Sequence, residues 1–197
     1  MSLEAWALAA LQSLPVYKED VGSAEKPAQL RMIARAVVEA AKETRGWPLS
    51  RKELIAADIS MLTNETHASL RIHRNECNLQ KRECDGGRAI SLFQLHAGAL
   101  SSPQIWPQLG FMTFESTKLS AAEASRVLTR SYRYCASKGQ PASSISIALM
   151  YTATAGRGCK LESWAGWKPR LDVYERVLRV PVPKEAVAQA DSPPRVD

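Results

Sequence analysis

The sequence predicts a mainly α-helical fold with a small irregular or β region and a helical extension at the N-terminus. Three observations support this prediction. Apolar residues recur at helical spacing from position 27 to position 43. Ser50 and Glu53 form the capping-box pattern that begins a helix. Between Leu70 and Ser120 the helical period is lost, and Asp85-Gly86-Gly87 indicates a turn flanked by short strands or loops.

Local signals bound the individual helices. Pro15 cannot continue a helix, so the first helix ends before it. Leu30, Ile33, Val37 and neighbouring apolar residues form one stripe, which turns a face of the second helix toward a core. A second capping-box pattern predicts a helix start at Ser120. We therefore expect helices over residues 3–14, 27–43, 50–69, from 120 onward, 142–154 and 169–179.

Length and composition limit the organisation of the chain. Its 197 residues, 45% hydrophobic and 23% charged, suffice for one domain with a sizeable core and exclude wholesale disorder. No apolar run approaches the roughly 18 residues of a membrane span. The acidic start Met1-Ser2-Leu3-Glu4 lacks the basic charge of a secretory signal. We expect a helical extension over 1–46 that packs on the core as part of the same globule, a core domain over 47–180, and an extended proline-containing tail over 181–197.

The net charge of +6 fits an anionic partner, such as nucleic acid, anionic lipid or cell-wall polymer, and it fits solubility alone equally well. No recognisable nucleic-acid recognition motif is present, so no nucleic-acid partner is predicted. Arg71, Arg74 and Arg88 lie in a loop region that also carries acids, which makes this region a mixed patch.

Glu65 is the residue with the clearest chemical potential. Met61 and Leu62 precede it by one helical turn, so its carboxyl is expected near apolar surroundings at the end of a helix. We expect desolvation and the helix C-terminus to raise the pKa of Glu65, which suits a proton donor. The alternative is a glutamate that faces solvent or pairs with Arg71 or Arg74.

Three segments follow one another in a recognisable order. The first is Glu65-Thr66, at the end of a predicted helix. The second is the segment 85–95, whose Gly-rich start leads into Ser91-Leu92-Phe93-Gln94. The third is the segment 148–156, which ends a predicted helix that contains Tyr151. Together they resemble the signatures of the soluble lytic transglycosylase and goose-type lysozyme superfamily. This resemblance covers about residues 50–158 and implies a lysozyme-like α+β domain.

The resemblance also implies roles for individual residues. Glu65 matches the general acid, which later acts as the base. Ser91, Phe93 and Gln94 match positions that line the sugar cleft, and Tyr151 matches a tyrosine whose hydroxyl sits near the acid. The resemblance implies no cofactor and no metal.

The sequence departs from the pattern of the family at four positions. Ala68 stands where an aromatic residue is expected, Ser91 replaces the usual glycine, Phe93 replaces methionine, and Thr152 stands where asparagine is usual. These departures concern contacts with substrate more than the fold.

The implied activity is cleavage of the β-1,4 bond between N-acetylmuramic acid and N-acetylglucosamine in peptidoglycan glycan strands. Attack by the muramic 6-hydroxyl gives the anhydro product of a lytic transglycosylase, and attack by water gives the product of a lysozyme. Glu76, Glu83 and Asp85 are candidate second carboxylates or part of a solvated loop. The competing function is a non-catalytic virion component or cell-wall-binding protein that retains the fold.

The cysteines allow several interpretations. Cys77 with Cys84, and Cys135 with Cys159, would form two disulfides. Free buried thiols are the second alternative. The third is a zinc site, although its Cys spacing is wider than usual. Its ligands would be His73, Cys77, Cys84 and His96.

Possible disulfides and a missing secretion signal point in opposite directions, since disulfides persist in oxidising compartments. A phage protein reconciles them. We hypothesise a protein that acts in the periplasm or cell wall after release by a holin or delivery in the virion, where other virion or tail proteins are its partners. A bacterial enzyme that has lost its leader is the alternative.

Overall fold

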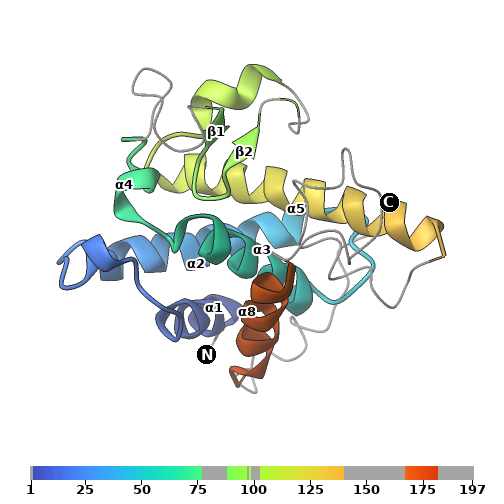
Figure 1. Cartoon of the computed structure of the whole chain (residues 1–197), viewed down its shortest axis with the longest axis horizontal. Coiled ribbons are helices and arrows are strands. Elements are labelled where there is room, and N and C mark those ends of the chain that lie inside the picture. The colour runs from blue at the N-terminus through green and yellow to red at the C-terminus, as the bar shows by residue number, and fades with distance from the viewer. Residues whose placement is uncertain (1, 77–87, 97, 99–102, 140–166, 182–197) are drawn as a thin grey trace.

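The structure, a computed structural model, describes residues 2–76, 88–96, 98, 103–139 and 167–181. Within them the fold is mainly helical with one small two-stranded antiparallel sheet (Figure 1), which confirms the predicted fold class. The elements are α1 (Leu3–Gln12), η1 (Lys18–Asp20), α2 (Lys26–Glu43), α3 (Arg51–Thr66), α4 (Leu70–His73), β1 (Ala89–Ile90), β2 (Leu95–His96), η4 (Pro103–Gln108), α5 (Phe114–Ser137) and α8 (Trp167–Arg179).

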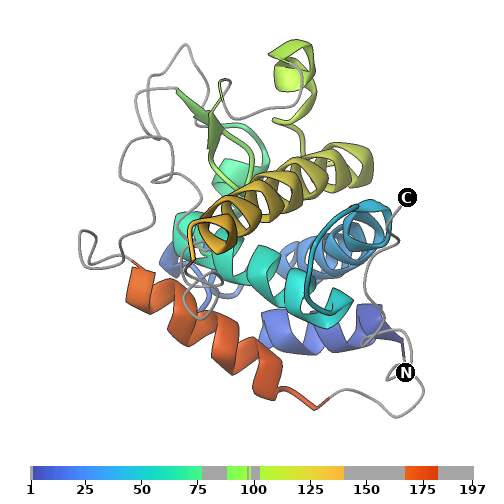
Figure 2. The ribbon, with the colours of Figure 1, turned by 90° about the vertical axis from the view of Figure 1, so that its right-hand side faces the viewer.

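α3 is the central helix of the molecule. It begins at the predicted capping box, in which the Ser50 hydroxyl accepts from the Glu53 amide and the Glu53 carboxylate accepts from the Ser50 amide. Every residue from Leu54 to Thr63 is buried, because α1, α2, α5 and α8 all pack against the helix (Figure 2). A helix buried on all sides carries no single apolar stripe. In its last turn Asn64 and Glu65 are half-buried, whereas Thr66 is buried again.

The N-terminal helices belong to the same hydrophobic core as α3. The Ser2 side chain caps α1, and Pro27 occupies the first turn of α2, where its missing amide hydrogen costs nothing. Trp6 is buried and donates from its indole to the carbonyl of Val180, 174 residues away (3.0 Å). The segment 1–46 therefore packs on the remainder of the fold as part of one core.

α5 packs along α2 and begins earlier than the sequence predicts. Thr113 caps it by accepting from the Ser116 amide, so the prediction of a start at Ser120 is wrong. The Ser120 hydroxyl lies inside the helix and bonds back to the carbonyls of Ser116 and Leu109. Among the described helices, none is both long and apolar enough to cross a membrane.

The region after α3 is irregular, as the lost periodicity indicates. β1 and β2 pair antiparallel, with Ala89 opposite His96 and Ile90 opposite Leu95. Both strands follow residues 85–87, and the turn predicted there lies outside the described residues. The predicted helix over 169–179 corresponds to α8, whereas the helix over 142–154 and most of the tail over 181–197 lie outside the described part of the chain.

Candidate functional site

Glu65 lies in the last turn of α3, where this buried helix reaches the surface. Met61 and Leu62, one turn earlier, are fully buried, whereas the Glu65 side chain is 17% exposed. The sequence analysis expected apolar surroundings for this carboxyl group, and the turn of α3 that precedes it is buried. Solvent still reaches the side chain itself.

Arg170, from the first half of α8, forms an ion pair with Glu65 through its guanidinium. Its side chain is only 8% exposed, and the Ser60 hydroxyl donates to its backbone carbonyl. A neighbouring guanidinium stabilises the ionised form of a carboxyl group. The packing of α8 on α3 thus places a fixed positive charge at the candidate acid.

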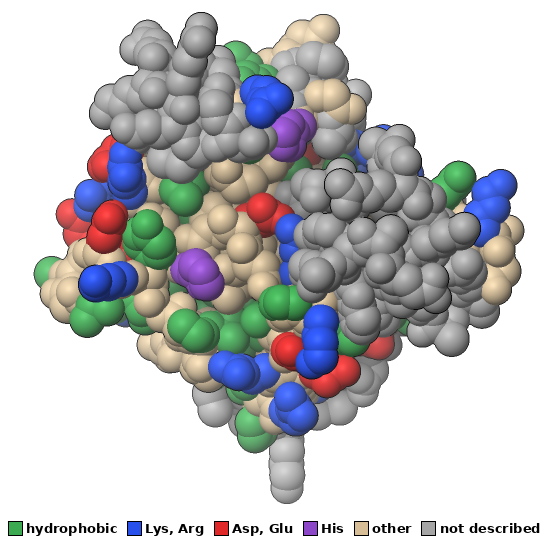
Figure 3. All heavy atoms as spheres, in the orientation of Figure 1, with side chains coloured by type: hydrophobic (Ala, Val, Ile, Leu, Met, Phe, Trp, Pro, Cys, Tyr) green, Lys and Arg blue, Asp and Glu red, His purple; other side chains and the backbone are tan. Residues whose placement is uncertain are grey.

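The partners that sequence reasoning considered for Glu65 are engaged elsewhere. Arg71 lies 3.9 Å from the Glu76 carboxylate, and Arg74 pairs with Glu25 and Glu76. Glu76, one of the candidate second carboxylates, is therefore part of a surface charge cluster. Figure 3 shows acidic and basic side chains close together on the face of the molecule that it draws.

The turn between β1 and β2 joins the end of α3. The Thr66 hydroxyl lies 3.0 Å from the carbonyl oxygen of Leu92 and 2.9 Å from that of Leu62. The Gln94 side chain donates from Nε2 to the carbonyl of Ser91 (2.9 Å), which closes the four-residue turn. The first two predicted segments, Glu65-Thr66 and 91–94, are thus neighbours in space.

The members of the 91–94 segment differ in exposure. Gln94 is partly exposed, Ser91 is mostly buried, and Phe93 has no exposed surface because its ring packs in the hydrophobic core. The Phe93 side chain is therefore a core residue here, not a surface that lines a cleft. Tyr151 lies outside the described residues, as do Glu83 and Asp85.

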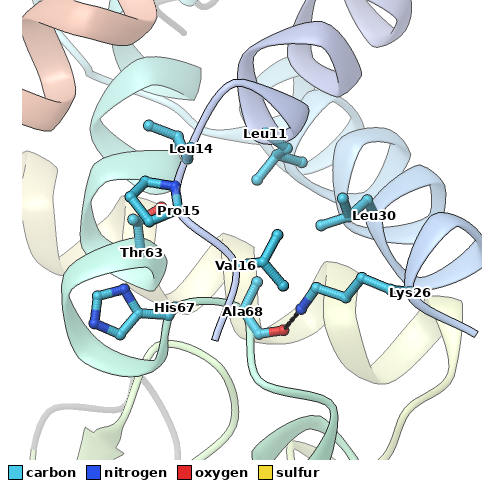
Figure 4. A pocket seen from close by; sticks show the side chains of 9 residues that line it. All are labelled: Leu11, Leu14, Pro15, Val16, Lys26, Leu30, Thr63, His67 and Ala68. Atoms are coloured by element: carbon cyan, nitrogen blue, oxygen red, sulfur yellow. Dashed lines mark hydrogen bonds between the residues drawn. The ribbon is translucent and has the colours of Figure 1, made fainter. Parts of the chain in front are cut away.

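An aromatic pair that the sequence analysis missed lies just beyond Glu65. The exposed imidazole of His67 stacks on Tyr17, with ring centroids 6.4 Å apart. Tyr17 comes from the connection after α1, and no periodic signal in that connection predicts its partner. Figure 4 shows the adjacent pocket, where Pro15 and Val16 face His67 and Ala68. Its volume of about 10 Å³ holds no more than a water molecule.

A buried ion pair positions the chain that follows Glu65. Lys26 donates to the Asp20 carboxylate (2.8 Å) and to the carbonyl of Ala68, while Asp20 also accepts from the Leu70 amide (2.9 Å). His67 and Ala68 adopt left-handed conformations with φ of 49° and 51°, which turn the chain sharply after α3. The pair holds this turn in place.

His73 does not fit the zinc alternative in this structure. Its Nδ1 lies 3.1 Å from Gln29 Nε2, and its Nε2 lies 2.7 Å from Thr117 Oγ1, so both ring nitrogens are occupied. Cys135 is disulfide-bonded, and the other three cysteines lie outside the described residues. Within the described residues no group of three or more His, Cys, Asp or Glu side chains is placed to hold a metal.

No family model, no curated protein and no solved structure matches this chain. The function is therefore inferred from its residues and their geometry.

Proposed function

We propose that the protein is a peptidoglycan-cleaving glycosidase with Glu65 as its general acid and base. The observation that carries the proposal is the position of Glu65, at the surface end of a helix that is buried from Leu54 to Thr63, beside the 91–94 turn. A single carboxyl group held this way, shielded on the side of the helix and open to solvent on the other, suits proton transfer to a leaving oxygen. The order of the three sequence segments gives the substrate class.

The proposed reaction requires one proton donor. Glu65 gives its proton to the oxygen that links muramic acid to glucosamine, and the bond from that oxygen to the muramic C1 breaks. The muramic 6-hydroxyl then attacks C1 and returns its proton to Glu65, or a water molecule does so. The first route forms a 1,6-anhydro sugar, and the second forms a reducing end.

The backbone of the 91–94 turn supports the assignment of this segment. Ser91 has a φ of 68°, a conformation that glycine adopts without strain and other residues adopt rarely. The resemblance places a glycine at this position. A backbone that favours glycine there agrees with the alignment of the segment to the motif of the family.

The second candidate function is a non-catalytic cell-wall-binding or virion protein. The ion pair with Arg170 is the observation that favours it, because a general acid must carry a proton and the guanidinium stabilises the carboxylate. If Glu65 is the general acid, bound substrate has to displace the Arg170 guanidinium or weaken its ion pair with the Glu65 carboxylate. The two candidates therefore differ in what Glu65 does once glycan is present.

Clearance of purified peptidoglycan suspensions separates the two functions. The wild type should reduce turbidity, Glu65→Gln should lose at least about 100-fold in rate, and Glu175→Gln should match the wild type. Glu175 is an exposed glutamate of α8, so its variant controls for the loss of one carboxylate. Activity in Glu65→Gln equal to the wild type removes Glu65 from the acid role. Inactivity of all three, with retained sedimentation on peptidoglycan, favours the binding protein.

Mass spectrometry of the released muropeptides identifies the bond and the route. A product about 18 Da lighter than the hydrolytic one, the mass of one water, marks the anhydro sugar. Detection of the protein in purified phage particles would place it in the virion. Its presence in a phage lysate but not in the purified particles would favour release by a holin. Both measurements follow from the proposal that the protein acts at the cell wall.

A further inference from the structure

A second concave site lies at the opposite end of α3 from Glu65. It is formed by the end of α2, by the connection that follows it and by α5 between Ala122 and Arg133, and its volume is about 670 Å³. That volume falls in the range of small-molecule sites. Arg45 lies in the connection that leads into the start of α3, whereas Glu65 lies near its end, roughly 20 Å along the helix.

Four arginines line this pocket: Arg45, Arg126, Arg130 and Arg133. The three on α5 are spaced by four and three residues, so they share one face of the helix and extend over roughly 10 Å of its length. Glu43 is the one acid in the lining, which leaves a formal charge of +3 from four cations and one anion. The pocket therefore concentrates much of the positive charge that the composition shows.

Gly46 makes room for one of these side chains. It has a φ of 75°, and a Cβ atom at this position would collide with the guanidinium of Arg133. The glycine thus serves two purposes, since it permits the left-handed turn and leaves room for the Arg133 guanidinium beside the connection. Arg133 is exposed, so its guanidinium remains open to solvent and to a ligand.

Two of the arginines have no acidic partner in the described part of the chain. Arg126 pairs with Glu123 at 3.0 Å, and Glu43 is bound by Lys118. No carboxylate of the described residues pairs with Arg130 or Arg133. The acids close to the pocket are thus already neutralised, while two guanidinium groups face the pocket with their charge uncompensated.

We propose that this pocket binds a phosphoryl-bearing anion through Arg130 and Arg133, with Arg45 and Arg126 completing the site. Guanidinium groups bind phosphate oxygens in pairs of parallel hydrogen bonds. A carboxylate brings one negative charge, whereas a phosphate monoester or a diphosphate brings about two or more and matches the two guanidinium groups of Arg130 and Arg133. The described lining contains no aromatic side chain on which a nucleobase would stack, which disfavours single-stranded nucleic acid.

Calorimetric titration of the full chain tests the site with pyrophosphate and inorganic phosphate as probes. The double variant R130Q/R133Q should weaken pyrophosphate binding about 10- to 100-fold, since it removes charge-assisted hydrogen bonds. R31Q/R176Q loses two exposed arginines elsewhere and should bind like the wild type. R130K/R133K keeps the charge without the planar fork and should fall between the two. Unchanged thermal unfolding of each variant shows that the fold is retained.

Further arms identify the source of the phosphoryl group. Binding of soluble pyrophosphate indicates a free phosphate compound, whereas sedimentation with phosphatidic acid vesicles but not phosphatidylcholine vesicles, lost in R130Q/R133Q, indicates a lipid phosphate monoester. The proposal is overturned if no phosphate probe binds at millimolar concentration or if R130Q/R133Q binds as tightly as the wild type. Equal affinity for citrate, or arginine-dependent binding of an oligonucleotide alone, also overturns it. Glu65→Gln should bind pyrophosphate normally, so the result is independent of the glycosidase proposal.

Discussion

His73 is a neutral histidine in the interior, and its environment explains why. Burial, and then the positive charge of Lys26, lower the pKa of His73 from its usual 6.5 to about 4. The Thr117 hydroxyl donates to the carbonyl of Thr113 (2.7 Å), so it can accept from the Nε2 hydrogen of a neutral imidazole while Gln29 donates to Nδ1. The hydrogen bonds thus match the uncharged ring.

This lowered pKa predicts loss of stability in mild acid. Below pH 6.5 the unfolded chain takes up a proton at His73 that the folded chain refuses down to about pH 4. The free energy of unfolding should therefore fall by about 3 kcal/mol between these values. Urea unfolding at several pH values measures the slope. The His73→Gln variant should lose the fall in unfolding free energy between pH 6.5 and pH 4, whereas His67→Gln, at an exposed histidine, should keep it. Equal slopes of unfolding free energy against pH in both variants would contradict the prediction.

The pKa of Asp58 is shifted in the opposite direction to that of His73. It is fully buried in α3, its Oδ2 accepts from the Ser125 hydroxyl (2.6 Å), and its Oδ1 has no partner among the described residues. Burial raises the pKa of Asp58 well above its ordinary value, and the hydrogen bond from Ser125 offsets this only in part. The folded chain therefore holds the proton to a higher pH than the unfolded chain.

The raised pKa gives a prediction of opposite sign to that for His73. Stability should decrease as the pH rises from about 4 through the folded pKa of Asp58, by at most about 1.4 kcal/mol per pH unit. In Asp58→Asn this loss is absent, so the unfolding free energy should rise more steeply with pH than in the wild type. Ser125→Ala serves as the comparison, because it removes the hydrogen bond but keeps the carboxyl. A shallower slope in Asp58→Asn rules out the assignment.

At the scale of elements, local signals predict helix ends that depend on a single turn of chain. Pro15 limits α1 to residues before it, and the Ser50 capping box places the start of α3, because both effects act within a few residues. The same kind of pattern at Ser120 fails, since Thr113 caps the helix earlier and leaves Ser120 inside it. A capping pattern is compatible with a helix interior as well as a start.

Local sequence signals predict the candidate site only in part, for the same reason. The place of Glu65 at a helix end follows from nearby residues, whereas Arg170 lies 105 residues further along the chain and meets it only when α8 packs on α3. Burial of Phe93 is likewise decided by how the hairpin docks on the helices, and Tyr17 meets His67 through the path of an irregular connection. Contacts between distant segments carry no periodic signal.

The chain that follows α3 should depend strongly on the buried ion pair of Lys26 and Asp20. Lys26→Met leaves the Asp20 carboxylate buried without its cation and should lower the unfolding free energy by about 3–5 kcal/mol. Lys42→Met is the matched control, because Lys42 pairs with Glu39 at an exposed site and should cost less than about 1 kcal/mol. Urea unfolding at pH 7 measures both, and similar losses in the two variants would contradict the argument.

At the scale of the whole molecule, the two ends of the described chain close over one core. α1 packs on α2 and α3, and α8 packs on α3, so the central helix contacts both terminal elements. The indole of Trp6 then bonds to the carbonyl of Val180 at the end of α8. The helices of the N-terminal segment therefore share one hydrophobic core with α3 and α8. The candidate acid is held in place by elements from both ends of the sequence.

The shared core predicts one cooperative unfolding transition rather than an early loss of α1. Trp6→Ala removes a buried indole from the contact between the ends and should lower the unfolding free energy by about 3–5 kcal/mol. Trp6→Phe keeps most of the apolar surface and loses the hydrogen bond to Val180, so its cost should be smaller, about 1–2 kcal/mol. In both variants, far-ultraviolet circular dichroism and the fluorescence of the remaining tryptophans should change together with urea, since Trp47 is buried in the same core. If Trp6→Ala instead loses part of its helical signal well before the environment of Trp47 changes, α1 folds as a separate unit, and the end of α3 does not depend on it.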